Sequence, residues 1–493
     1  MNSQGIQHPA EQRLLEAALE QVYGGEAFEA AHAASRRQSR SPRQWLQVAL
    51  FLFGLGVTAL VLWQARDDVL VGAQDPWQNP AHYGTEHRAD GRIEIEALPA
   101  DITNLSCFLL EVKDLELLKR FQSLRRLQVF TRNVHIGKID LKIKHKSWAT
   151  PPADVFTPIA SLPLLETLTL PMQVDLTGQH LAPLSRSPRL RELWVMGEQI
   201  PLTADCVAAM QKLSLLTSLR LDLVRADAEV IARLRKLGLR SMQISRCPGF
   251  DEKAFAEICA TPTLQSLSFD RMGTRQLGNE GNGTYWLPST EVLSGLKELP
   301  RLRQLRFSTS LITGEELRAL PETISSLELW ATELLPDDYR ALRRFGSLRQ
   351  LKVRTARQSF ALVPRDSAAQ EREAANVIAD TLARLQLRQF VFQGAVTELL
   401  LRELGLQPAL EDLQMLAAEW PSLDPLAQAP KLRSLQLASV GWRRPGSAPC
   451  SLDDLRPMTA CRSLKALTLV RMNGLQRDEV SAVFGANVVV TAK

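Results

Sequence analysis

The chain has 493 residues, of which 45% are hydrophobic, so it can bury a core and global disorder is excluded. Its net charge of +5 comes from 59 basic and 54 acidic residues, which excludes the strongly basic composition of a typical nucleic-acid-binding protein. The six cysteines are scattered without a Cys-x-x-Cys pair, so we expect buried free thiols and no metal cluster. A disulfide between Cys450 and Cys461 is the alternative in an oxidising compartment.

Residues 1–44 are predicted to form an N-terminal cytoplasmic segment. Apolar residues from Leu14 to Val22 fall at helical spacing, which predicts a short amphipathic helix before Gly24-Gly25. Two interpretations stay open: a docking helix for a cytoplasmic partner, or a solvated helix without a specific role.

Residues 45–63, WLQVALFLFGLGVTALVLW, are predicted to be a transmembrane helix. They contain no charged residue and would reach about 28 Å as a helix, close to the ~30 Å hydrocarbon core. Trp45 and Trp63 stand at the ends, where indole rings favour the membrane interface. Residues 34–44 hold four arginines and no acid, whereas acids outnumber bases in 64–90. The positive-inside rule therefore predicts a cytoplasmic N-terminus and an extracytoplasmic remainder.

Two alternatives to a membrane span were weighed. A buried core helix rarely lacks charge over such a length. A cleaved signal peptide is disfavoured because 44 residues precede the apolar run, which is itself longer than a signal core. We therefore predict an uncleaved signal-anchor helix, followed by a linker at 64–95.

The remainder, residues 96–493, is dominated by the spacing Leu-x-x-Leu-x-Leu. The last three residues of each core alternate between buried and outward positions, which predicts a short strand with one buried face. Helices are predicted between the cores, for example over Thr313–Leu320, where Thr313 and Glu316 form a capping box. Most intervals between cores are 19–26 residues, so the units must stack as a repeat array. The cores are 105–110, 124–129, 165–170, 190–195, 216–221, 239–244, 264–269, 302–307, 324–329, 348–353, 387–392, 410–415, 432–437 and 464–469.

The pattern resembles the leucine-rich repeat family over about residues 105–490. The resemblance implies an α/β solenoid with a parallel β-sheet on its concave side and helices on its convex side, here preceded by one transmembrane helix. Cys247 matches the ladder position, where the family often has Asn or Cys, while most other repeats carry different residues there. Residues 93–100 precede the first core as a cap, and 487–490 are predicted to be a closing strand.

Four intervals are longer than the rest, and each insertion follows a strand: 131–157, 272–288, 355–367 and 439–450. Since units stack in register, all four are predicted to leave from one edge of the solenoid, where long loops are often functional. Drift without function is the alternative. The first insertion predicts a β-hairpin around Gly137-Lys138. It would bind anionic polymer or lipid head groups through its basic residues Lys138, Lys142, Lys144 and Lys146. The alternative is a solvated basic hairpin without a partner.

Outward positions of the cores predict a polar concave face that includes Trp and Arg, the composition of binding hot spots. The alternative is that these residues only cover neighbouring strands. A basic residue also follows the first apolar residue of many cores, and we interpret this row as scaffold. The expected partner contacts are Trp194, Arg220, Arg306, Glu328, Trp330 and Lys352, among outward residues that also include Gln128, Thr169, Gln243, Ser268 and Gln436.

No motif predicts catalysis, a cofactor or a metal site, so we expect a protein that is not an enzyme. The leading hypothesis is a single-pass membrane protein that presents a leucine-rich-repeat domain outside the cytoplasm. It would bind a protein or polymer ligand, and no nucleic acid, through its concave face and insertion edge. The alternatives are an envelope structural scaffold that binds anionic surfaces, or a signalling receptor that relays binding to the N-terminal helix.

Overall fold

The computed structural model describes most of the chain beyond residue 86. The described residues are 87–90, 92–109, 111–131, 134–136, 139–141, 151–172, 177–197, 201–247, 249–270, 289–308, 312–330, 335–354, 367–417, 420–439, 451–470, 475–485 and 488–492. The chain divides into two compact units, Met1–His82 with Val134–Lys142, and Tyr83–Asn133 with Ile143–Lys493.

In the first unit the described residues form a two-stranded antiparallel sheet. Strands β4 (Val134–Ile136) and β5 (Ile139–Leu141) pair with Val134 opposite Leu141. This pairing confirms the predicted β-hairpin. The lysines expected to make it basic, Lys138, Lys142, Lys144 and Lys146, lie outside the described residues.

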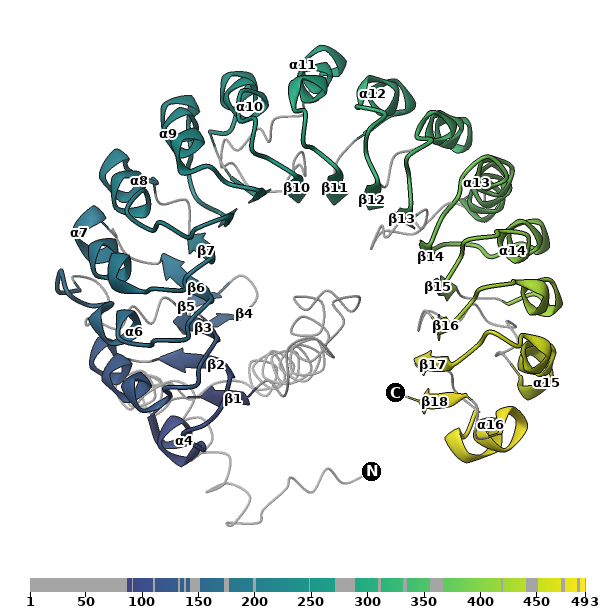
Figure 1. The fold of residues 1–493 in the computed structure, drawn as a ribbon, viewed down its shortest axis with the longest axis horizontal. Coiled ribbons are helices and arrows are strands. Elements are labelled where there is room, and N and C mark those ends of the chain that lie inside the picture. Colours follow the sequence, from purple (N-terminus) through teal and green to yellow (C-terminus); the bar gives the residue numbers. More distant parts are fainter. Residues whose placement is uncertain are drawn as a thin grey trace, which may run out of the picture. The chain divides into compact units, whose positions relative to one another are not determined.

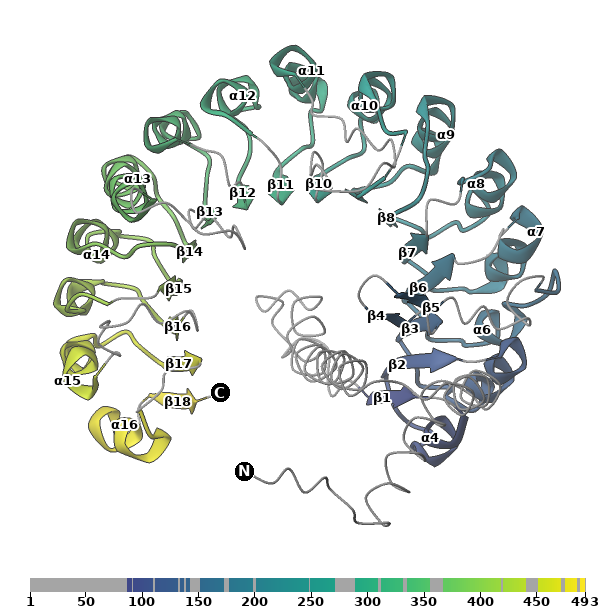
Figure 2. The same ribbon diagram turned by 180° about the vertical axis from the view of Figure 1, so that it is seen from behind.

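The second unit is an α/β solenoid. Its sixteen described strands form one parallel sheet. In this sheet each strand is hydrogen-bonded to the sheet strands that come before and after it in the chain. Figures 1 and 2 show the strands on the inner side of a curved body and the helices on its outer side. The strands are β1 (His87–Asp90), β2 (Asn104–Leu109), β3 (Arg126–Thr131), β6 (Thr167–Met172), β7 (Glu192–Gly197), β8 (Ser218–Asp222), β9 (Ser241–Ser245), β10 (Ser266–Asp270), β11 (Gln304–Ser308), β12 (Ser326–Trp330), β13 (Gln350–Arg354), β14 (Gln389–Gln393), β15 (Asp412–Ala417), β16 (Ser434–Ser439), β17 (Ala466–Val470) and β18 (Val489–Ala492).

Helical segments return the chain from the end of one strand to the start of the next. The α-helices of this unit are α4 (Arg92–Ala97), α6 (Thr157–Ala160), α7 (Gly178–Leu181), α8 (Ala204–Met210), α9 (Ala228–Leu234), α10 (Glu252–Cys259), α11 (Thr290–Ser294), α12 (Gly314–Ala319), α13 (Ser367–Leu382), α14 (Glu398–Gly405), α15 (Leu452–Leu455) and α16 (Arg477–Phe484). The 3-10 helices are η2 (Val112–Arg120), η3 (Ala182–Arg186), η4 (Arg235–Leu237), η5 (Gly295–Glu298), η6 (Pro336–Arg344), η7 (Asp424–Gln428) and η8 (Arg456–Ala460).

Helix starts follow the predicted capping chemistry. The Glu316 carboxylate accepts a hydrogen bond from the Thr313 backbone N–H at 2.5 Å, as in a capping box. Ser289 Oγ accepts from Val292 N, and Ser451 Oγ accepts from Asp454 N. These bonds satisfy N–H groups that the helix itself leaves without partners.

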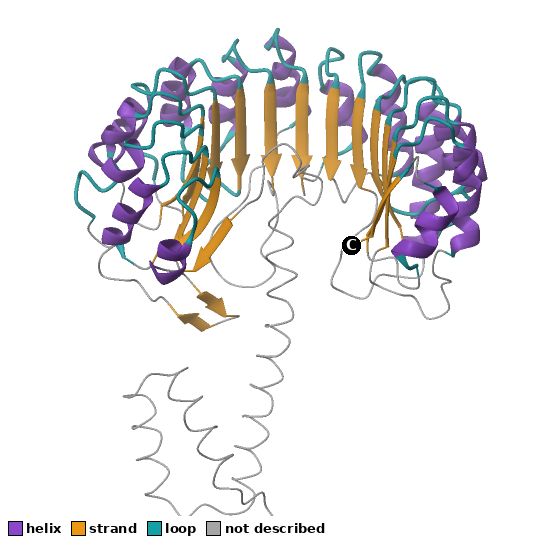
Figure 3. Cartoon of the chain, turned by 60° about the horizontal axis from the view of Figure 1, so that its bottom comes forward, coloured by secondary structure: helices purple, strands orange, loops and turns teal. Residues whose placement is uncertain are grey.

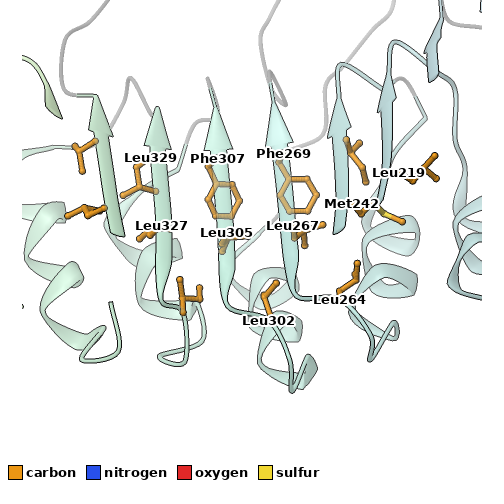
Figure 4. Packing of buried hydrophobic residues seen from close by; sticks show 14 of the residues in the cluster. Leu219, Met242, Leu264, Leu267, Phe269, Leu302, Leu305, Phe307, Leu327 and Leu329 are labelled. Carbon is orange, nitrogen blue, oxygen red and sulfur yellow. The ribbon is translucent and has the colours of Figure 1, made fainter. Parts of the chain in front are cut away.

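The core is the layer between sheet and helices. In the parallel sheet, each strand from β2 to β17 buries at least two apolar side chains, and the apolar residue that opens each repeat is buried just before the strand, as Leu302, Leu305 and Phe307 show in Figure 4. Phe269 and Phe307 of neighbouring repeats stack with ring centroids 5.7 Å apart. Since each repeat covers the apolar residues of the next, no repeat can bury its own leucines alone.

The register corrects the first core. Leu105 pairs with Leu127, and Cys107 with Val129, so the first core is 102–107 and not 105–110. Ile102 takes the opening apolar position and is buried. The six-residue pattern matches at both places, and pairing with β3 decides between them.

Both ends of the sheet carry an additional strand. The closing strand expected at 487–490 is β18, which pairs with β17. At the other end β1 pairs with β2, and α4 follows it. The solenoid therefore starts inside residues 64–95, which the sequence suggested as a linker.

Among the described residues, no helix is both long enough and apolar enough to cross a membrane. The predicted span 45–63, with Trp45 and Trp63, lies outside the described residues.

Candidate functional site

The concave face is built from outward side chains of the sheet. Neighbouring strands pair without a register shift, so Trp194 pairs with Arg220 and Arg306 with Glu328. The middle outward positions therefore form one row across the sheet, which we call the central row. Of the expected partner contacts, the structure places Trp194, Arg220, Arg306, Glu328 and Lys352 in this row.

Arg306, Glu328 and Lys352 form an ion triad on β11, β12 and β13. The Glu328 carboxylate lies 3.0 Å from Arg306 Nε and 3.3 Å from Lys352 Nζ. Its side chain is only 11% exposed, and the two cations help to offset its lost hydration. The triad holds two cations to one carboxylate and therefore presents a local positive charge.

Trp194 and Arg220 form a second cluster on β7 and β8. The Arg220 guanidinium lies over the Trp194 ring, 5.6 Å from its centroid, within the range of a cation–π interaction. Both side chains are half-buried, so a planar, ordered surface faces the concave side.

Asp222 and Arg246 extend this second cluster, and neither was predicted from the sequence. The Arg246 guanidinium donates two hydrogen bonds to the Asp222 carboxylate, at 2.9 Å and 2.6 Å. Arg246 has φ 50°, a left-handed conformation that is uncommon for a residue with a side chain. Such conformations concentrate at functional sites. Extending the in–out alternation two residues beyond the middle position would have placed Asp222 on the concave face.

Small outward residues are covered by long neighbours. Thr169, which pairs with Trp194, and Ser268, which pairs with Arg306, are both buried. For these two positions the alternative interpretation, that outward residues only cover the sheet, fits best. Trp330 is the last residue of β12, and its side chain lies outside the described residues.

The four insertions follow strands that end at one edge. They follow β3, β10, β13 and β16, and Figure 3 shows the parallel strands with their carboxyl ends at a common edge. The departure points therefore share one edge, as expected for stacked units. Residues 272–288, 355–366 and 440–450 lie outside the described residues, whereas 134–136, 139–141 and 151–157 of the first insertion are described.

The opposite edge carries the second predicted row, which we call the basic ladder. Each member stands directly before its strand, and its carbonyl or amide bonds to the adjacent repeat. The members are Arg125, Arg191, Arg240, Arg303, Arg349, Arg388, Arg433 and Lys465.

The five cysteines that the structure describes are free thiols, and Cys450, the predicted alternative disulfide partner of Cys461, lies outside the described residues. Cys107, Cys206, Cys247 and Cys461 are buried free thiols, and Cys259 is half-buried. Cys247, at the position after the strand where the leucine-rich repeat family often has Asn or Cys, donates weak hydrogen bonds to Leu221 O and Ser245 O. Across the part of the chain that the structure describes, no group of three His, Cys, Asp or Glu residues could hold a metal ion.

No family model and no curated protein sequence matches the chain. The solved structures that are similar to it include two that we describe. One is an internalin from Listeria monocytogenes, with 13% identity and a TM-score of 0.29, which covers 75% of this chain and 80% of the internalin. The other is the Rad7–Elc1 complex from yeast, with 15% identity and a TM-score of 0.39, which covers 69% of this chain and 86% of the matched one.

Proposed function

We propose that this chain is a membrane-anchored protein whose solenoid binds a protein partner on its concave face, outside the cytoplasm. The observation that carries the proposal is the central row, with the Trp194–Arg220 pair and the Arg306–Glu328–Lys352 triad. Trp and Arg held on rigid strands are characteristic of the hot spots of protein interfaces.

The two clusters also suggest the chemistry of the partner. The triad has an excess cation, so it suits an acidic side chain, and the Trp194 ring suits an apolar or aromatic one. Their side chains are already ordered by contacts within the sheet. Binding would therefore cost little side-chain entropy.

The membrane anchor is supported by the sequence of residues 45–63 and by the four arginines that precede it. Protease added to intact cells tests the topology. We expect cleavage in the repeats, while residues 1–44 become accessible only after permeabilisation. Protected repeats with accessible residues 1–44 would reverse the proposed orientation.

Proximity labelling from the anchored chain, followed by affinity measurement with each purified candidate, tests the concave face. Trp194→Ala combined with Arg306→Ala should weaken binding at least about tenfold, since two hot-spot side chains are lost. Arg384→Ala combined with Arg477→Ala removes two exposed arginines outside the sheet and should leave the affinity unchanged. If the Trp194→Ala/Arg306→Ala variant binds the partner as tightly as the parent and the control variant do, concave-face binding is contradicted.

A further inference from the structure

The basic ladder concentrates positive charge on one rim of the solenoid. The residue directly before a strand is basic in eight of the described repeats and acidic in two. The whole chain, by contrast, has a net charge of only +5. The two acids lie within the row itself, where Glu166 pairs with Arg125 and Glu411 with Arg433. The rim is therefore strongly basic while the molecule is nearly balanced.

Scaffolding explains only part of the ladder. The guanidiniums of Arg303 and Arg349 donate to carbonyls of the preceding turn. Those of Arg191, Arg240 and Arg388 are exposed and have no hydrogen-bond or ion-pair partner among the described residues. These three arginines have no structural task that the fold reveals.

The ladder also places like charges before neighbouring strands. Arg388 N donates to Arg349 O, and Lys465 N donates to Arg433 O, so each pair occupies adjacent strands. Like charges in such positions repel and contribute nothing to the stability of the sheet. An anion bound along the row would offset this repulsion.

Acidic residues stand at the helix starts of the other edge. Helices start there, and their first turns carry acids such as Glu252, Glu291, Glu315 and Asp478. Acids at helix starts also complement the helix dipole, but the ladder precedes strands and has no such explanation. The described helix starts at that edge thus carry acids, whereas the charged residues of the ladder position, before the strands, are mostly basic.

We propose that the basic ladder docks the solenoid, by its amino-terminal rim, on the anionic head groups of a membrane. Because the strands pair without register shift, the ladder residues occupy one register position, each directly before its strand, and Figure 3 shows these strands side by side in one sheet. The chain also enters β1 at this rim, 24 residues after residue 63. The proposal rests on the proposed membrane anchor only for the nearness of the membrane. The ladder contains no aromatic residue for base stacking, which disfavours single-stranded nucleic acid.

The test uses the full chain with a fluorophore on the rim and vesicles that contain a quencher lipid. Gln265→Cys places the label between Arg240 and Arg303, in a chain that also carries Cys259→Ser and Cys450→Ser. Glu315→Cys, in the first turn of α12 at the opposite edge, is the control position. We expect quenching of the rim label with phosphatidylcholine–phosphatidylserine vesicles, but not with phosphatidylcholine alone, and none at the control position.

Charge variants separate the ladder from net charge. Arg191→Gln, Arg240→Gln and Arg388→Gln together should abolish the quenching. Arg225→Gln, Lys253→Gln and Arg477→Gln remove three exposed cations elsewhere and should preserve it. An unquenched rim label on anionic vesicles, equal loss in both triple variants, or protection of the rim label by duplex DNA instead of lipid would overturn the proposal. Flotation with phosphatidylcholine vesicles reports the anchor separately, so either proposal can fail alone.

Discussion

Arg306 and Glu328 lie opposite each other on β11 and β12 and form an ion pair with a Nε–Oε1 distance of 3.0 Å. The carboxylate is buried more deeply than either of the two cations beside it. The arrangement is therefore a buried anion shared by two partly exposed cations, with Lys352 on the far side. Such a group stabilises the sheet only while all three members are present.

Glu328→Gln should destabilise the solenoid. The variant leaves Arg306 and Lys352 close together without the carboxylate that separates them, and removing one partner of a buried ion pair typically costs about 3 kcal/mol. We expect a lower urea midpoint by circular dichroism. Glu192→Gln is the control, since Glu192 accepts one hydrogen bond, from the Thr167 hydroxyl, and should cost less. Equal decreases of the urea midpoint in the two variants would show that the three charges of the triad do not stabilise the sheet together.

Gly405→Ala tests the close packing of neighbouring repeats. A Cβ on Gly405, at the end of α14, would overlap the Pro425 carbonyl oxygen of the next repeat. Because that oxygen belongs to the backbone, the repeats must separate, at a cost of about 1–3 kcal/mol. Gly346→Ala is the control, because a Cβ there meets nothing within 4 Å. Thermal unfolding should show a lower midpoint for the first variant alone, and a similar decrease in both would contradict this explanation.

Asp412→Asn should make the chain more stable at neutral pH. Burial raises the pKa of Asp412 above its ordinary value of 3.8, and Glu411 raises it further, while Arg433 lowers it. A raised pKa in the folded state means that folding favours the protonated acid, so stability falls as pH rises through the raised pKa. The neutral amide removes this loss.

Urea titrations at two pH values check the sign. At pH 7 the urea midpoint of the variant should be higher than that of the parent. The difference should vanish near pH 3, where the side chains of Asp412 and of its Asn replacement are both neutral. Asp453→Asn, at an exposed site, provides the comparison. A benefit of Asp412→Asn that is the same at both pH values would exclude ionisation as its cause.

The repeat architecture could be predicted because each strand depends on a short local pattern. Leu432, Leu435 and Leu437 are buried as their spacing requires, and the same holds for nearly every repeat. The pattern failed at Leu105, where two overlapping matches exist and only the pairing with β3 distinguishes them. It also missed β1 (His87–Asp90), which has no leucine core and forms a strand because β2 offers it an open edge.

The site could be predicted only in part, for a related reason. Trp194 and Arg220 were found because they lie inside the cores. Asp222 and Arg246 follow their cores, and their contact joins residues 24 apart in the sequence. Single-sequence periodicity shows which face a residue occupies, but not which side chain of the next repeat it meets. The basic ladder was visible in the sequence, yet its place opposite the acidic helix starts emerges only when the repeats are stacked.

The cysteines provide a last prediction, on reactivity. Burial raises the pKa of both Cys107 and Cys247 to about 12, and the nucleophile in alkylation is the thiolate. At pH 8 both groups are therefore protonated as well as inaccessible. Iodoacetamide followed by mass spectrometry should leave both unmodified in the folded chain and modify both in urea. The Cys247→Ser variant controls for assignment of the peptide. Modification of Cys247 in the folded chain at a rate near that in urea would show that the contacts of its thiol with Leu221 O and Ser245 O open readily.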